Sequence, residues 1–195
     1  MKRLFDIVFS LIFLILLLPL YLIISLSIII DSKGGIFYRQ QRVGKNSIDF
    51  WLYKFRTMRT GAEKNGLLTI GSNDTRVTKV GYILRKYKMD ELPQLFNILL
   101  GDMSIVGPRP EVRKYVNLYN KEQLTVLSVK PGLTDFASLA YINESDLLAQ
   151  NKEPETLYIN EIMPDKLRLN LEYIETRSFF TDFQIILKTV KKIFI

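Results

Sequence analysis

The stretch that decides the architecture is IVFSLIFLILLLPLYLIISLSIII, residues Ile7–Ile30. It contains no charged residue, and its 24 residues exceed the roughly 20 that a helix needs to cross the core of a bilayer. It is also too long for the apolar core of a signal peptide, and no small-residue cleavage site follows it. We therefore expect residues 1–31 to form a retained membrane segment, in preference to a buried helix of a soluble domain.

Pro19 divides this apolar segment near its middle. A proline inside a helix removes one backbone hydrogen bond and favours a kink. Cations on both sides of the segment give no orientation for a crossing helix, but they suit a bent helix that enters and leaves on the cytoplasmic side. We predict a re-entrant helix, with an ordinary tilted anchor as the alternative. The flanking basic residues are Lys2, Arg3, Lys33, Arg39 and Arg42.

The composition of the 195 residues restricts the chemistry that this chain can support. A net charge of +7 points to an anionic partner, which is a nucleic acid, an acidic membrane surface or a phosphorylated substrate. The chain has no cysteine and no histidine, which excludes thiolate and imidazole zinc sites, cysteine nucleophiles, disulfides and Ser-His-Asp triads. Catalysis would have to use carboxylates, Lys, Arg, Tyr, Ser or Thr, and a metal would be a hard cation such as Mg²⁺.

Residues 32–195 are polar enough to fold in water as a second unit. The pattern predicts short strands at 36–38 and 47–55 around a turn at 43–46, and then a long loop at 57–74 that is rich in Gly, Asn and Thr. Helical periodicity follows, so the fold class is mostly α with minor β. The expected helices cover residues 80–88, 92–100, 111–119, 120–128, 164–177 and 181–194.

The last expected helix, residues 181–194, is amphipathic. Phe183, Leu187 and Val190 share one face, and three lysines occupy the other positions. A basic amphipathic helix can lie on an anionic membrane surface. A terminal helix packed on the core of its own domain has the same pattern, so both interpretations stay open.

The segment richest in side chains that could take part in a reaction is GYILRKYKMDELPQLFNILLGDMSIVGPRPE, residues 81–111. In it Asp90 and Glu91 stand side by side at the expected start of the helix 92–100, with Asp90 as its N-cap and cations nearby. Clustered cations at a helix start suit a phosphate group, and carboxylates there can bind Mg²⁺ or attack phosphorus. Such a pair is also what an ordinary helix cap and first-turn charge look like.

The run Gly107-Pro108-Arg109-Pro110 is a second unusual feature. Two prolines restrict the backbone on either side of one arginine, which lowers the entropy lost when its guanidinium binds a phosphate. A rigid turn with an exposed arginine is the alternative. Composition alone does not separate the two.

Several short motifs occur in order along nearly the whole chain. They are Lys2-Arg3, Phe5-Asp6, Gln41 to Gly44, Lys54 to Met58, Thr78 to Gly81, Leu84-Arg85, Asp90 to Leu95, Asn97, Gly101 to Ser104, Gly107 to Pro110 and Lys130 to Thr134. Together they resemble the bacterial sugar transferase family, whose members are monotopic phosphoglycosyl transferases. The chain departs from the family pattern at two places. Leu18, in place of a serine, precedes Pro19, and Leu133 to Ser138 replace the usual Thr, Gly and Trp, so we do not assign the sugar.

The resemblance implies an active site. Asp90 would be the nucleophile that forms a covalent phosphosugar intermediate, and Glu91 would hold Mg²⁺ or assist proton transfer. Asp90 and Glu91 are the expected metal ligands. The expected phosphate-binding residues are Arg85, Arg109, Lys54 and Arg56.

The resemblance also implies partners and a location. A UDP-sugar would be the donor and a polyprenyl phosphate the acceptor, with UMP released, and the enzyme would contact membrane lipid and no nucleic acid. Its small catalytic domain, carrying amphipathic interfacial helices, would face the cytoplasm at the bacterial inner membrane, and a homo-oligomer is compatible with the sequence. The alternative is a noncatalytic membrane-tethered module that binds nucleotide or another anion during assembly.

Overall fold

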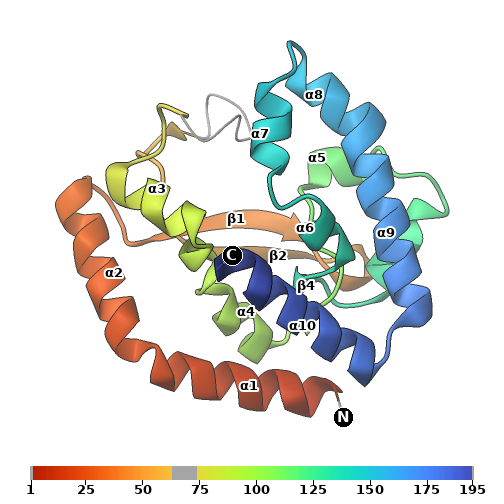
Figure 1. Ribbon diagram of the computed structural model, residues 1–195, viewed down its shortest axis with the longest axis horizontal. Coiled ribbons are helices and arrows are strands. Elements are labelled where there is room, and N and C mark those ends of the chain that lie inside the picture. The colour runs from red at the N-terminus through yellow and green to blue at the C-terminus, as the bar shows by residue number, and fades with distance from the viewer. Residues whose placement is uncertain (1, 63–73, 195) are drawn as a thin grey trace.

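The computed structural model of the protein describes residues 2–62 and 74–194, so most of the loop expected at 57–74 lies outside the described residues (Figure 1). The apolar N-terminal segment forms two helices, α1 (Lys2–Leu16) and α2 (Leu18–Asp31), which meet at 62°. Within the described residues no helix is long and apolar enough to cross a membrane by itself, whereas this bent pair meets the criterion together. The break predicted at Pro19 is confirmed, because this residue lies in the first turn of α2.

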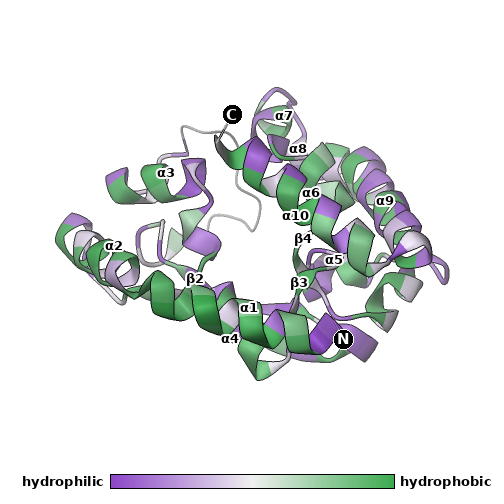
Figure 2. Ribbon diagram, turned by 60° about the horizontal axis from the view of Figure 1, so that its bottom comes forward, coloured by the Kyte–Doolittle hydropathy of each residue, from purple (hydrophilic) through white to green (hydrophobic). Residues whose placement is uncertain are grey.

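Helices α1 and α2 run along two adjoining edges of the molecule, at the bottom and the left of the view (Figure 1). Both are strongly hydrophobic along their length (Figure 2). Their inward faces pack on the rest of the chain, while twelve large apolar side chains remain at least 47% exposed. These are Leu4, Val8, Leu11, Ile12, Ile15, Leu16, Leu18, Leu22, Ile23, Leu26, Ile29 and Ile30.

An antiparallel hairpin follows, made of β1 (Phe37–Val43) and β2 (Asp49–Phe55), in which Phe37 pairs with Phe55 and Val43 with Asp49. The second strand is confirmed, but β1 extends well beyond the predicted 36–38. Its residues 39–42 are all polar and give no alternation, so only pairing with β2 makes them a strand. The short helix η1 (Lys45–Ser47) closes the hairpin, with Asn46 at φ 56°.

The segment with the carboxylate pair comprises α3 (Lys79–Lys86), the 3-10 helix η3 (Met89–Glu91) and α4 (Gln94–Leu100). The prediction that Asp90 caps a helix is wrong. Lys88 adopts a left-handed conformation at φ 55°, so the chain turns into η3, which carries Asp90 and Glu91, before α4 begins. The predicted stop at Gly101 is confirmed, since its φ of 99° ends α4.

A second, parallel pair of strands was not predicted. It consists of β3 (Ser104–Val106) and β4 (Gly132–Thr134). Three-residue strands give no periodic signal, and the pairing depends on two glycines. A Cβ on Gly132 would lie 2.1 Å from the amide nitrogen of Gly107, so only glycine allows the backbones to approach this closely.

The C-terminal half is helical. The predictions at 164–177 and 181–194 are confirmed by α9 and α10, whereas the helices expected at 111–119 and 120–128 shrink to α5 and η4. The short helices between β4 and α9 were missed, because none is long enough to show a period. The bounds are α5 (Arg113–Val116), η4 (Gln123–Ser128), α6 (Phe136–Ala140), α7 (Glu144–Ala149), α8 (Pro154–Leu157), η5 (Tyr158–Ile162), α9 (Met163–Thr176) and α10 (Phe179–Phe194).

The N-terminal helices contribute to two of the three hydrophobic clusters. Phe5, Phe9 and Phe13 of α1 pack against a central cluster that includes Ile98 of α4 and Ile185 of α10. In a second cluster, Tyr21, Ile24 and Ile28 of α2 pack with Phe55 and Leu84. The third cluster lies between α5, η4, α7, η5 and α9 and does not involve the N-terminal helices. The fold is therefore mostly helical with two small sheets, and the N-terminal segment is part of its packing.

Candidate functional site

The site forms where four segments meet. Helix η3 supplies Asp90 and Glu91, the end of β2 supplies Lys54, and the loop after β3 supplies Arg109. Arg85 comes from the last turn of α3. The structure thus brings together five of the six residues that the sequence predicted for the site.

Glu91 is held by two cations. Lys54 Nζ lies 3.1 Å from Glu91 Oε1, Arg109 Nη1 lies 3.0 Å from Oε2, and Arg109 Nη2 also donates to Oε1. Burial by itself would raise the pKa of Glu91, but the charges of Arg109 and Lys54 outweigh it and hold that pKa well below its ordinary value. Glu91 therefore stays ionised at any physiological pH.

Asp90 contrasts with its neighbour. It is only 7% exposed, and among the described residues its carboxylate has no hydrogen-bond or ion-pair partner. Burial raises the pKa of Asp90 above its ordinary value, and the charge of Glu91 adds to this while Lys54 opposes it. An unpaired carboxylate in a buried site with cations close by is chemically available, which is what a nucleophile requires.

Lys54 and Arg85 complete the charged surroundings. Burial lowers the pKa of Lys54 despite the opposing effect of Glu91, and burial likewise lowers the pKa of Arg85 despite Asp90. The Arg85 guanidinium donates to Thr57 Oγ1 at 2.9 Å, which orients it. Both cations can contribute to binding an anion at this site.

Arg56 has different surroundings. Its guanidinium donates to the carbonyl oxygens of Lys33 at 2.8 Å and Ser32 at 2.7 Å, at the C-terminal end of α2. Cations at this end of a helix bind its free carbonyl groups and complement its dipole. The structure therefore gives Arg56 a role in fastening α2 to β2, and the phosphate-binding role stays a prediction.

The loop that carries Arg109 is positioned by residues to which the sequence analysis assigned no individual role. The backbone amide of Arg109 donates to Asp135 Oδ2 at 3.1 Å, and the amide of Gly107 donates to the carbonyl of Thr134 at 3.0 Å. Asp135 is fully buried and also caps α6 through the amide of Ser138. Its position before a short helix was the available signal, because aspartate is a preferred N-cap.

Asn97 is another residue whose role the sequence did not reveal. It is fully buried in α4, where its Nδ2 donates to the carbonyl of Trp51 at 2.7 Å and its Oδ1 accepts from the amide of Tyr53 at 3.0 Å. These two bonds attach α4 to the β2 backbone beside Lys54. The side chain thereby sets the distance between the segments that carry the Lys54–Glu91 pair.

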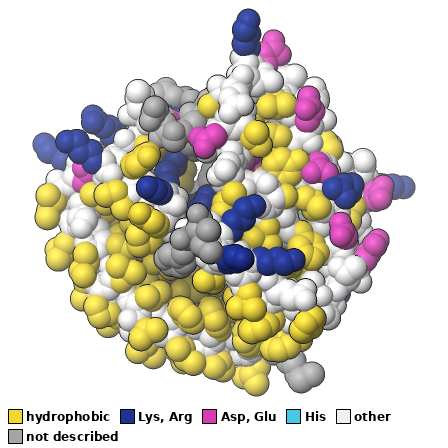
Figure 3. Space-filling model, viewed as in Figure 1, with side chains coloured by type: hydrophobic (Ala, Val, Ile, Leu, Met, Phe, Trp, Pro, Cys, Tyr) yellow, Lys and Arg dark blue, Asp and Glu magenta, His cyan; other side chains and the backbone are white. Residues whose placement is uncertain are grey.

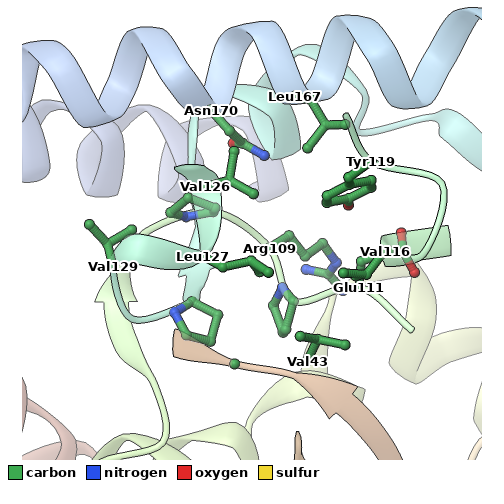
Figure 4. A pocket seen from close by; sticks show the side chains of 14 residues that line it. Val43, Arg109, Glu111, Val116, Tyr119, Val126, Leu127, Val129, Leu167 and Asn170 are labelled. Atoms are coloured by element: carbon green, nitrogen blue, oxygen red, sulfur yellow. The ribbon is translucent and has the colours of Figure 1, made fainter. Parts of the chain in front are cut away.

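A small cavity lies behind the Arg109 loop, between the end of β1 and helix α9 (Figure 4). Its volume is about 20 Å³, enough for about one water molecule. Asn170 lines it, and the Oδ1 atom of this buried residue has no partner within the described part of the chain. The cavity is far too small for a ligand of the size of a nucleotide.

One face of the molecular surface combines basic and apolar side chains. Lys and Arg side chains gather near the centre of the face in Figure 3, and apolar side chains over α1 and α2 border them. A polar, cationic centre next to a wide apolar border is a surface that can contact a charged headgroup and a hydrocarbon chain together.

The candidate ligands for a divalent cation at this site are the two carboxylates, Asp90 and Glu91. No cluster of three or more Asp or Glu side chains occurs in residues 2–62 and 74–194. Mg²⁺ commonly takes one or two carboxylates and completes its shell with water and substrate phosphates. The adjacent Asp90 and Glu91 fit that mode, with Asp90 the more accessible ligand because cations already occupy the oxygens of Glu91.

Known proteins are similar to this chain along nearly its whole length. The family model described as bacterial sugar transferase matches residues 1–195. A UDP-N-acetylgalactosamine-undecaprenyl-phosphate N-acetylgalactosaminephosphotransferase of Aeromonas hydrophila is 35% identical over 98% of this chain and 43% of its own length. A UDP-glucose:undecaprenyl-phosphate glucose-1-phosphate transferase of Klebsiella pneumoniae is 39% identical over all of this chain and 40% of its own length.

A shorter relative matches almost from end to end. The uncharacterized sugar transferase EpsL of Bacillus subtilis is 35% identical over 100% of this chain and 88% of its own length. This chain therefore spans less than half of the Aeromonas and Klebsiella relatives and nearly all of EpsL. By the match to the family model over its whole length, this chain belongs to the bacterial sugar transferase family.

Proposed function

We propose that this chain transfers a sugar 1-phosphate from a UDP-sugar to a polyprenyl phosphate, of the undecaprenyl type, and releases UMP. The observation that carries the proposal is the contrast between two adjacent carboxylates. Glu91 is held by two cations, whereas Asp90 is buried and has no partner among residues 2–62 and 74–194. The names of the Aeromonas and Klebsiella relatives support the choice of donor and acceptor.

Asp90 is the proposed nucleophile. One of its oxygens attacks the phosphorus that carries the sugar, forming a P–O bond, while the bond from that phosphorus to the bridging oxygen breaks and UMP leaves with that oxygen. An oxygen of the polyprenyl phosphate then attacks the same phosphorus. The Asp90 carboxylate leaves, and a polyprenyl diphosphosugar is the product.

The cations around Asp90 explain how a carboxylate can approach a charged diphosphate. Lys54 and Arg85 lie close enough for their positive charges to lower the pKa of Asp90, opposing the effect of burial. They would offset the charge on the transferred phosphoryl oxygens, while Arg109 keeps Glu91 in place beside the nucleophile. Mg²⁺, held by Asp90 and Glu91 together with the donor phosphates, would supply further positive charge when bound.

The bent helix pair is the proposed membrane anchor. The exposed apolar faces of α1 and α2, with the 62° bend between them, suit a helix that enters one leaflet and returns. Helix α10 adds to this surface, since Phe179, Phe183 and Leu187 are 64%, 47% and 54% exposed. We place the protein at the bacterial inner membrane with its catalytic part facing the cytoplasm, where it contacts lipid and initiates glycoconjugate assembly, as a monomer or a homo-oligomer.

A noncatalytic anion-binding module is the second candidate. The net charge of +7 and the basic, apolar-edged surface favour it equally. A protein that only binds anions gains nothing from a buried, unpaired carboxylate, because the negative charge of that carboxylate repels a bound diphosphate. Donor binding without UMP release, across a panel of UDP-sugars, would select this alternative.

The test uses membranes that contain the full chain, labelled UDP-sugars and polyprenyl phosphate. We expect release of UMP, formation of polyprenyl diphosphosugar, and labelled phosphosugar trapped on Asp90. Asp90→Asn should lower turnover by about 10³-fold or more, whereas Asp146→Asn, at an exposed position on α7, should leave it unchanged. Full turnover by Asp90→Asn would refute the proposed mechanism.

Stability provides an independent check on the same variant. Burial raises the pKa of Asp90, so ionised Asp90 makes the folded protein less stable relative to the unfolded chain. Asp90→Asn should therefore unfold at the wild-type temperature or above it. A loss of activity accompanied by a lower melting temperature would indicate a folding defect instead.

Topology is tested separately. We expect cysteines introduced at Lys2 and at Ser32 to be protected from an impermeant thiol reagent in intact cells, because both ends of the helix pair would face the cytoplasm. Both should react after the membrane is permeabilised. Labelling at Lys2 from outside would require a helix that crosses the bilayer.

A further inference from the structure

Tyr21 links the proposed membrane helix to the segment that carries the carboxylate pair. It lies in the first turn of α2 and is only 7% exposed. Its hydroxyl donates to the carbonyl oxygen of Leu92 at 2.6 Å, across 71 residues of sequence. Leu92 directly follows Glu91, so a side chain of α2 contacts the backbone next to the site.

The ring of Tyr21 packs against a residue next to Lys54, the cation that pairs with Glu91. Its centroid lies 5.2 Å from that of Phe55, which directly follows Lys54. Lys54 Nζ and Glu91 Oε1 are 3.1 Å apart. One side chain therefore packs against the neighbour of Lys54 and hydrogen-bonds to the neighbour of Glu91, which restricts how far the two segments can separate.

The Leu92 carbonyl has an unusual hydrogen-bonding position. In a regular α-helix it would accept from the amide of Phe96, but that amide donates to Pro93 O at 3.0 Å. The amide of Leu95 reaches Leu92 O at 3.0 Å and leaves room for a second donor. The Tyr21 hydroxyl fills that place, at the junction where η3 passes into α4.

The break between the two N-terminal helices sets the position of Tyr21. The amide of Tyr21 donates to Leu17 O at 2.9 Å, so this residue follows the break by a single turn. Further along α2, Asp31 Oδ2 accepts from the amide of Val80 at 2.9 Å, at the start of the helix that carries Arg85. With the contacts of Arg56 described above, α2 is attached to the segments that supply Lys54, Arg85 and Glu91.

We propose that Tyr21 is a positioning residue for the Asp90–Glu91 pair, holding η3 against the end of β2 through its hydroxyl group and its ring. This inference rests on the proposed function for its link to turnover. The bend at Pro19 then has a second purpose besides membrane insertion, because it directs α2 toward the site. Tyr21 does not contact the substrates in this role.

The test removes only the hydroxyl. Tyr21→Phe keeps the ring and its packing, and we expect kcat to fall about tenfold while KM for the donor stays within about twofold. Tyr173→Phe is the matched control, since Tyr173 is equally buried and its hydroxyl donates to Asp182 Oδ1 at 2.7 Å. It should leave kcat unchanged per folded molecule. Wild-type kcat in Tyr21→Phe, or an equal loss in Tyr173→Phe, would overturn the inference.

A second measurement does not depend on activity. Hydrogen–deuterium exchange of the full chain in lipid nanodiscs reports on the amide of Leu95, which shares the Leu92 carbonyl with Tyr21. We expect faster exchange in residues 91–96 of Tyr21→Phe and no change there in Tyr173→Phe. If the wild-type protein releases no UMP, the proposed function fails, and the exchange result still decides whether Tyr21 positions this segment.

Discussion

Arg109 binds both carboxylate oxygens of Glu91, with its Nη1 atom 3.0 Å from Oε2 and its Nη2 atom donating to Oε1. Such a two-point contact between a planar guanidinium and a carboxylate fixes orientation as well as charge. Lys54 adds a third contact from β2. Glu91 is thereby a fixed anionic group beside Asp90, and this arrangement supports the proposal that Asp90 is the nucleophile.

Removing the charge of Glu91 should destabilise the fold. In Glu91→Gln, Lys54 and Arg109 would lose their counter-charge in a largely buried site, and we expect a loss of about 3 kcal/mol in the free energy of unfolding. Glu155→Gln is the control, because the Lys114–Glu155 pair is about half exposed and should contribute less than about 1 kcal/mol. Thermal or denaturant unfolding in nanodiscs measures both. Equal stability of the two variants would contradict this view of the site.

The pH dependence of turnover should report the raised pKa of Asp90. Attack requires the ionised carboxylate, so kcat/KM should fall as the pH drops through a value above the ordinary 3.8. Lys54 lowers the pKa of Asp90, so Lys54→Met should move this acidic limb to higher pH. Lys152→Met, at an exposed position, should leave the limb where it is. A limb at or below 3.8 would show that the titration of Asp90 does not limit the reaction.

Arg56 offers a test between its structural and phosphate-binding roles. Its guanidinium donates to carbonyl groups at the end of α2, so Arg56→Met should lower the melting temperature and reduce stability by about 2 kcal/mol or more. KM for the donor should stay within about twofold. Arg39→Met, at an exposed position on β1, is the control and should change neither quantity. A large rise in KM with unchanged stability would favour the phosphate-binding role.

The close approach of β3 and β4 predicts a strong effect of one methyl group. A Cβ at Gly132 would lie 2.1 Å from Gly107 N, so Gly132→Ala should cost about 3 kcal/mol or more and displace the loop that carries Arg109. At Gly35 the nearest atom would be 3.8 Å away, an ordinary contact, so Gly35→Ala should be tolerated. Expression level and melting temperature measure the difference. A Gly132→Ala protein as stable as the wild type would show that the strands can separate freely.

Local signals in the sequence predicted the elements that are long or that begin or end at a proline or a glycine. The break at Pro19, the stop at Gly101 and the helices α9 and α10 all followed from proline, glycine or a sustained period. The elements that were missed or misplaced are short. Asp90 was expected to cap a helix because aspartate often does so, but the left-handed turn at Lys88 begins a 3-10 helix there instead.

The sequence by itself determined which chemical groups are present: an apolar segment with a break, two adjacent carboxylates, several cations, and no thiol or imidazole. Only the tertiary structure decided which carboxylate is paired and which is available. Lys54 and Arg109 lie 37 and 18 residues from Glu91 along the chain, yet both reach it in the folded protein. Charge pairing depends on distance in space and on burial, and these are set by the packing of β2, η3 and the loop after β3.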